Sequence, residues 1–119
     1  MNTFSFKLYG GYTVSVVKDE VTIKYAGEKV LFFTRSKPRE KTFSLKDVIR
    51  VDYKESSSMM FGYVRFVTEP MDQYVSSVYM ARHDEYSFMV ERDEVHQLNA
   101  VLNLVKKAAP KMSIVKNKS

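Results

Sequence analysis

The chain has 119 residues, of which 45% are hydrophobic and 28% charged, and its formal net charge is +5. This length suits one domain, and the composition is typical of a soluble globular protein rather than a disordered or membrane-spanning one. Because there is no cysteine, disulfides, thiolate nucleophiles and cysteine-ligated zinc are excluded. The sequence shows no signal-peptide pattern and no apolar run of membrane-spanning length, so we expect a cytoplasmic protein.

The positive charge is concentrated at the C-terminal end. Residues 106–119 contain five lysines and no acidic residue, whereas residues 1–105 carry 14 basic and 14 acidic side chains. We therefore expect one domain over residues 1–107, followed by a lysine-rich, flexible tail over residues 108–119.

Seven segments show the alternation of apolar and polar residues that is typical of β-strands. Short polar or glycine-containing breaks between most of them predict tight antiparallel connections. A longer interruption, residues 69–84, separates the last two segments. The seven predicted strands are residues 12–16, 21–25, 29–34, 41–45, 48–54, 62–68 and 86–90.

The spacing of apolar residues changes after the last strand. Val95, Leu98, Leu102 and Val105 are spaced as on the buried face of a helix, which Pro110 would terminate. Seven strands followed by one helix, without βαβ alternation, predict a mainly β, α+β fold. We expect a bent antiparallel sheet or partial barrel, capped by the C-terminal helix.

Three stretches resemble the bacterial branch of the pleckstrin-homology-like domains, a group of unknown function. Lys41–Val51 is similar to the family's short strand, polar corner and longer strand, and Gly62–Phe66 is similar to its glycine-led sixth strand. Asp84–Phe88 leads into the terminal helix as the family's last strand does. The resemblance covers about residues 12–107 and implies a seven-stranded, strongly bent sheet capped by a helix.

The resemblance carries no specific ligand with it, because one fold supports many functions. Eukaryotic pleckstrin-homology domains bind phosphoinositides through basic residues in the loop between their first two strands. The loop expected at that place is Lys18-Asp19-Glu20, which is short and net acidic. The family's lipid-binding pattern is therefore not expected there.

No combination of residues predicts catalysis, a metal or a cofactor. His83 and His96 do not share a metal-binding spacing, and the chain has neither a nucleophile elbow nor a phosphate-binding glycine loop. The acidic pairs Asp84-Glu85 and Asp93-Glu94 are typical of turns and helix caps. We therefore expect a non-catalytic protein without a cofactor or a small-molecule substrate.

The segment before the last strand is the first candidate binding surface. Its aromatic, valine and methionine side chains bury large areas when they meet a partner, although they could equally extend the neighbouring strands into the core. The leading hypothesis is a binding or assembly module of a bacterium or its phage, acting through protein contacts or self-association by a sheet edge or this segment. The candidate contact residues are Met71, Tyr74, Val75, Val78, Tyr79 and Met80.

A basic loop is the second candidate, with Arg35, Lys37, Arg39 and Lys41 as possible anion ligands. Together with the lysine-rich tail, it could bind an anionic membrane surface, which is the alternative hypothesis. For the basic loop itself we favour the simpler interpretation, a solvated turn that keeps a sheet edge soluble. Nucleic-acid binding is a third and weaker hypothesis, because exposed aromatics interleaved with the basic residues are not evident.

Overall fold

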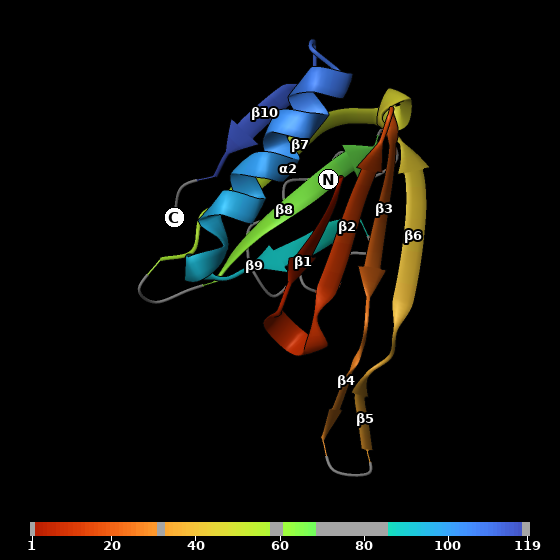
Figure 1. Ribbon diagram of the computed structural model, residues 1–119, viewed down its shortest axis with the longest axis vertical. Coiled ribbons are helices and arrows are strands. Elements are labelled where there is room, and N and C mark those ends of the chain that lie inside the picture. Colours follow the sequence, from red (N-terminus) through yellow and green to blue (C-terminus); the bar gives the residue numbers. More distant parts are fainter. Residues whose placement is uncertain (1, 31–32, 58–60, 69–85, 118–119) are drawn as a thin grey trace.

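The computed structural model describes residues 2–30, 33–57, 61–68 and 86–117, with the side chains of 28–36 left out. Within these ranges the chain forms two four-stranded sheets, a two-stranded ribbon and one C-terminal α-helix, which is an α+β arrangement (Figure 1). None of the described helices has the length and apolar character needed to cross a membrane.

The first sheet is an antiparallel meander at the N-terminal end of the chain. Alternate residues of its second strand, Tyr12, Val14 and Val16, are buried, while the residues between them are partly exposed, as the period of two requires. A short 3₁₀ turn, η1 (Leu8–Gly10), connects the first two strands. In spatial order the strands are β1 (Thr3–Phe6), β2 (Tyr12–Val17), β3 (Glu20–Tyr25) and β6 (Arg39–Ser44).

The ribbon extends the hairpin of β3 and β6 away from the body of the molecule (Figure 1). It consists of β4 (Glu28–Val30) and β5 (Phe33–Ser36), which pair antiparallel. The sequence had predicted a strand over residues 29–34 and a loop over residues 35–39. The single strand was wrong, because residues 29–30 and 33–34 belong to two different strands, β4 and β5, which pair antiparallel. Strand structure also continues through Ser36, and β6 begins at Arg39.

The second sheet follows a sharp corner, the 3₁₀ turn η2 (Leu45–Asp47), where the Ser44 hydroxyl accepts a hydrogen bond from the Lys46 amide at 3.1 Å. Three of its strands form an antiparallel meander, and the C-terminal strand pairs in parallel with the first of the three. In spatial order the strands are β10 (Ser113–Lys116), β7 (Val48–Lys54), β8 (Gly62–Thr68) and β9 (Ser87–Val90).

The helix α2 (Val95–Ala108) contacts β1 and β2 and buries Leu98, Val101, Leu102 and Val105. It follows the 3₁₀ turn η4 (Arg92–Glu94), in which Glu91 and Glu94 form a reciprocal capping box. Both sheets and the helix share one core. Two ring contacts connect the sheets: Phe6–Phe88 at 4.7 Å and Phe43–Phe66 at 5.2 Å between centroids.

The expectation of a single seven-stranded sheet was wrong. The chain turns at η2 and begins a second sheet, because a corner with a capped 3₁₀ turn breaks the ladder between β6 and β7. Two additional strands also differ from the sequence expectation. Thr3–Phe6 forms β1, which was too short to stand out as a strand, and Ser113–Lys116 forms β10 within the segment expected to be a flexible tail.

Candidate functional site

The first predicted binding surface, which consists of Met71, Tyr74, Val75, Val78, Tyr79 and Met80, lies outside the described residues. Phe61, close to that segment in sequence, is 39% exposed, and its ring meets Tyr9 edge-on at 6.2 Å.

The four residues of the predicted basic loop do not form one exposed cluster. Arg35 lies in β5 with its side chain undescribed, and Lys37 is exposed. Arg39 and Lys41, both on β6, are partly buried and lie over aromatic rings. The Arg39 guanidinium is 4.7 Å from the centre of the Tyr25 ring, and the Lys41 ammonium is 5.2 Å from that of Tyr86. These cation–π contacts tie the two side chains to the fold.

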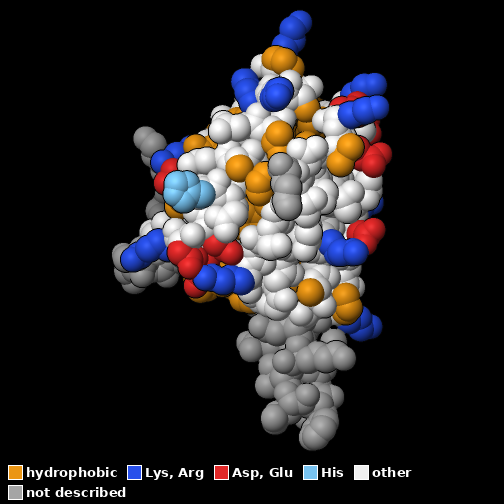
Figure 2. Space-filling view, in the orientation of Figure 1, with side chains coloured by type: hydrophobic (Ala, Val, Ile, Leu, Met, Phe, Trp, Pro, Cys, Tyr) orange, Lys and Arg blue, Asp and Glu red, His pale blue; other side chains and the backbone are white. Residues whose placement is uncertain are grey.

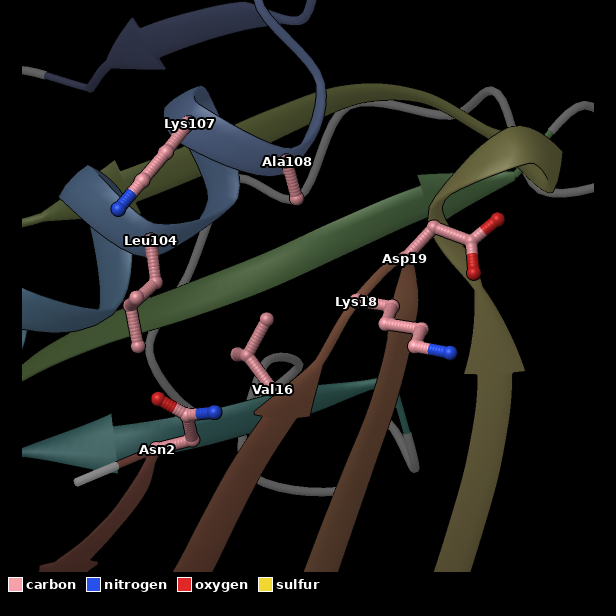
Figure 3. A pocket seen from close by; sticks show the side chains of 7 residues that line it. All are labelled: Asn2, Val16, Lys18, Asp19, Leu104, Lys107 and Ala108. Atoms are coloured by element: carbon pink, nitrogen blue, oxygen red, sulfur yellow. The ribbon is translucent and has the colours of Figure 1, made fainter.

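A groove beside the helix is a better-formed surface. It lies between the C-terminal half of α2 and the end of the β2–β3 hairpin and has a volume of about 510 Å³. Val16 of β2 and Leu104 of α2 point toward each other across it, while Lys18 and Asp19 extend away from Leu104 (Figure 3). We call this surface the α2 groove. It is lined by Asn2, Val16, Lys18, Asp19, Leu104, Lys107 and Ala108.

The groove combines an apolar floor with positively charged sides. Val16, Leu104 and Ala108 supply the apolar part, and Lys18 and Lys107 are both exposed. Among the described residues, no hydrogen bond or ion pair engages either lysine. The Asp19 carboxylate, in contrast, has a partner, since the Lys46 ammonium lies 3.5 Å from it. The two lysines are therefore available for an anionic ligand.

Lys18 holds an unusual backbone conformation. It is the first residue of the two-residue turn between β2 and β3, and its φ is +55°. Left-handed backbone is unfavourable for a residue with a Cβ atom, and glycine or asparagine is the usual choice in such a turn. The lysine thus stands at the edge of the groove at some cost in stability.

Further lysines surround the same end of the molecule, where Lys and Arg side chains gather (Figure 2). Lys106 and Lys107 occupy the last turn of α2, and Lys111 lines a neighbouring groove of about 450 Å³ with the exposed Ile49. Lys46 lies in η2, close to Asp19 and Asp47. These five lysines outnumber the neighbouring acidic residues Asp19, Glu20 and Asp47, so this end carries a positive charge.

The acidic residues at the other end of α2 are already engaged. The carboxylates of Glu91, Asp93 and Glu94 lie within 4.8 Å of one another. The Lys7 ammonium bonds Asp93 at 2.6 Å, and the Lys7 amide donates to Glu94 at 3.0 Å. Glu94 also accepts from the Glu91 amide at 2.9 Å. This cluster anchors the start of α2 to the end of β1, so its geometry is explained without a bound ion.

Comparison with known proteins gives a family and no function. The family described as Domain of unknown function (DUF4429) matches residues 14–105, which is most of the chain. The chain belongs to the DUF4429 family. No curated protein and no solved structure matches it. The DUF4429 match begins within β2 and continues through β9 and most of α2, whereas β1 and β10 lie outside it.

Sequence reasoning missed the α2 groove because its lining comes from three distant parts of the chain: the N-terminus, the end of β2 with the turn that follows it, and the end of α2. A lysine in a two-residue hairpin turn was the one local signal available. The sequence alone did not show that this turn would lie beside Lys107.

Proposed function

We propose that this DUF4429 domain is a non-catalytic, pleckstrin-homology-like binding module that takes up an acidic, amphipathic segment of a partner protein in the α2 groove. The order of elements supports the fold part of the proposal. A four-strand meander, a corner, a three-strand meander and a terminal helix follow one another, if the ribbon is counted as an extension of β3 and β6.

Phosphoinositide binding in the manner of eukaryotic pleckstrin-homology domains has little support. Since β1 is the first strand, the loop between the first two strands spans residues 7–11 and not Lys18-Asp19-Glu20. Its one basic residue, Lys7, is held by Asp93 at 2.6 Å. A phosphate group at this loop would have to compete with that ion pair.

The observation that carries the proposal is the pairing of an apolar floor with two unengaged lysines in the α2 groove. An amphipathic segment can bury leucine-like side chains against Val16 and Leu104 while its carboxylates meet Lys18 and Lys107. Burial of the apolar side chains supplies affinity, and the charges supply orientation and faster association.

Binding to an anionic membrane is the second candidate, favoured by the five lysines around the C-terminal end of α2. Each lysine close to an anionic surface contributes roughly 1 kcal/mol. Val17 and Ile49, which are 55% and 44% exposed, lie at the end of β2 and the start of β7 and could enter the headgroup region. This candidate rests on a different set of residues from Arg35, Lys37, Arg39 and Lys41.

The test is a titration of the labelled protein followed by backbone NMR. The probes are a designed peptide with glutamate and leucine on opposite helix faces, and vesicles of anionic or zwitterionic lipid. The proposal expects the peptide to shift the amides of Val16, Lys18, Leu104 and Lys107 saturably. A charge-reversed double variant, Lys18→Glu with Lys107→Glu, should lose most of this affinity.

Lys37→Glu is the matched control, since it reverses a charge on an exposed lysine at the ribbon end of the first sheet. It should bind the peptide with nearly unchanged affinity. Flotation with anionic vesicles, without any saturable response to the peptide, would favour the membrane candidate. If neither probe responds to the groove variants, the groove is not the binding surface.

A further inference from the structure

Residues 112–117 are bound to the second sheet in the way that a short peptide binds to a receptor. Ser113–Lys116 forms a parallel ladder with β7, in the register Ser113 to Arg50 through Lys116 to Tyr53. The side chains of Ser113, Val115 and Lys116 are exposed. Main-chain pairing therefore accounts for much of the contact within β10, as in strand addition to a sheet edge.

Two side chains flanking the strand provide the specific anchors. Met112 is 7% exposed and belongs to the shared core. Asn117 is 8% exposed, its side-chain amide donates to the Tyr63 hydroxyl at 2.6 Å, and its backbone amide donates to the Tyr53 carbonyl at 2.7 Å. A buried methionine and a buried asparagine thus bracket a four-residue strand. Such spaced anchors allow a strand site to select its peptide.

The strand β7 and the segment that pairs with it lie in different parts of the chain. The acceptor strand β7 and Tyr63 lie inside the DUF4429 match, whereas residues 112–117 lie beyond it. They are joined to α2 by a tight turn that contains Pro110, in which the Met112 amide donates to the Ala109 carbonyl at 2.9 Å. The Lys106 ammonium donates to the Met112 carbonyl at 2.8 Å and closes the turn.

We infer that the edge of β7 on which β10 lies, with its Tyr63 anchor point, is a strand-acceptor site that the same segment of a second copy can fill in place of the chain's own β10. Exchange would form every contact of residues 112–117 again between two chains, giving a symmetric dimer. Because the monomer and the exchanged dimer form the same contacts, the equilibrium between them depends on protein concentration and on strain in the short turn. This inference concerns a different surface from the α2 groove and does not depend on the proposed function.

The first experiment changes the turn in the full-length chain. Deleting Pro110 and Lys111 shortens the connection so that residues 112–117 cannot return to their own β7. Light scattering after size exclusion should then show a dimer at micromolar concentration. Adding Asn117→Ala to the deletion should raise the dissociation constant about a hundredfold, because the symmetric dimer loses a buried hydrogen bond at each of its two exchanged segments and each loss costs about tenfold. A folded deletion variant that stays monomeric would overturn the inference.

The second experiment remains informative if the deletion impairs folding. The full-length Asn117→Ala chain, whose own segment binds less well, is titrated with a fluorescent peptide of residues 112–119. The peptide should bind saturably and compete with unlabelled peptide. A peptide with Asn117→Ala should bind about tenfold more weakly, whereas one with the exposed Ser113→Ala should bind equally well. Absence of binding, or equal binding by all three peptides, would contradict the inference.

Discussion

Lys18 places a Cβ atom where the backbone favours glycine. The φ of Lys18 is +55°, so its backbone is strained. Lys18→Gly should relieve this strain, while Val17 and Glu20 remain paired on either side of the turn. Relief of about 1–2 kcal/mol, less the entropy cost of glycine, predicts a gain of about 0.5–1 kcal/mol in the free energy of unfolding. Urea denaturation measures it. Lys18→Ala, which keeps the Cβ atom, is the control and should give no such gain; equal gains would show that strain is not the cause.

Lys7 gives the protein a dependence on alkaline pH. Its hydrogen bond with Asp93, together with the negative charges of Asp93 and Glu91, raises the pKa of Lys7 above its ordinary value of 10.5. Because the pKa of Lys7 is raised on folding, its ion pair contributes fully to stability below pH 10.5. This contribution is lost as the pH rises through the pKa that Lys7 has in the folded protein. The contribution is small, because the pair is exposed.

The measurement compares the wild type with Lys7→Met by chemical denaturation from pH 8 to pH 11.5. The stability advantage of the wild type should be constant at the lower values and shrink above about pH 10.5. The two proteins share every other side chain, so the difference in stability between them reports the effect of Lys7. A difference that stays constant across the range would show that the Lys7 ion pair does not contribute.

At the scale of an element, the start of β8 depends on the absence of a side chain at Gly62. A Cβ atom there would overlap the Lys54 carbonyl and lie 2.8 Å from the Ser56 amide nitrogen. These are backbone atoms of the preceding strand and loop, which cannot rotate away. Gly62→Ala should therefore lower the free energy of unfolding by about 3 kcal/mol or more, measured in urea. Phe61→Ala, at the exposed neighbouring position, should cost below about 1 kcal/mol; similar losses would refute the steric explanation.

Some of the strands and the helix could be predicted from the sequence, and others could not. The strands β2 and β3 and the helix α2 were expected within a few residues, because each buries one face and repeats its pattern over several positions. The strands β7 and β8 were also expected, although β8 is buried along its whole length and β7 buries Asp52 and Lys54. Elements stabilised by partners far away in the chain were not expected. The strand β10 is four residues long with mostly exposed side chains, and its pairing with β7 and the Asn117–Tyr63 hydrogen bond have no local signature.

The candidate site shows the same limit at the scale of the whole molecule. The excess of lysines near the C-terminus could be found by counting charges, and the structure adds Lys18 from the β2–β3 turn and Lys46 from η2 to them. Counting could not reveal that Arg39 and Lys41 lie over Tyr25 and Tyr86, since those contacts depend on the pairing of β6 with β3 and on the approach of the two sheets.

The ribbon accounts for part of the elongated shape, which measures 45 × 29 × 29 Å, and it projects from a core formed by the two sheets and α2 (Figure 1). Tyr25 and Arg39 are directly paired at its base. Replacing residues 26–38 by Asn-Gly should therefore close β3 and β6 with a two-residue turn. We expect Tm to change by no more than about 4 °C, because the shared core is retained.

The shortened protein also tests assembly through a sheet edge, because it removes both edges of the ribbon. If copies associate there, the solution mass of the wild type should exceed that of one chain while the shortened protein is monomeric. Equal association states would direct attention to the β7 edge, where deletion of Pro110 and Lys111 should still produce a dimer in the shortened chain. Loss of folding on shortening would instead show that contacts such as that between β4 and η1 are part of the stable core.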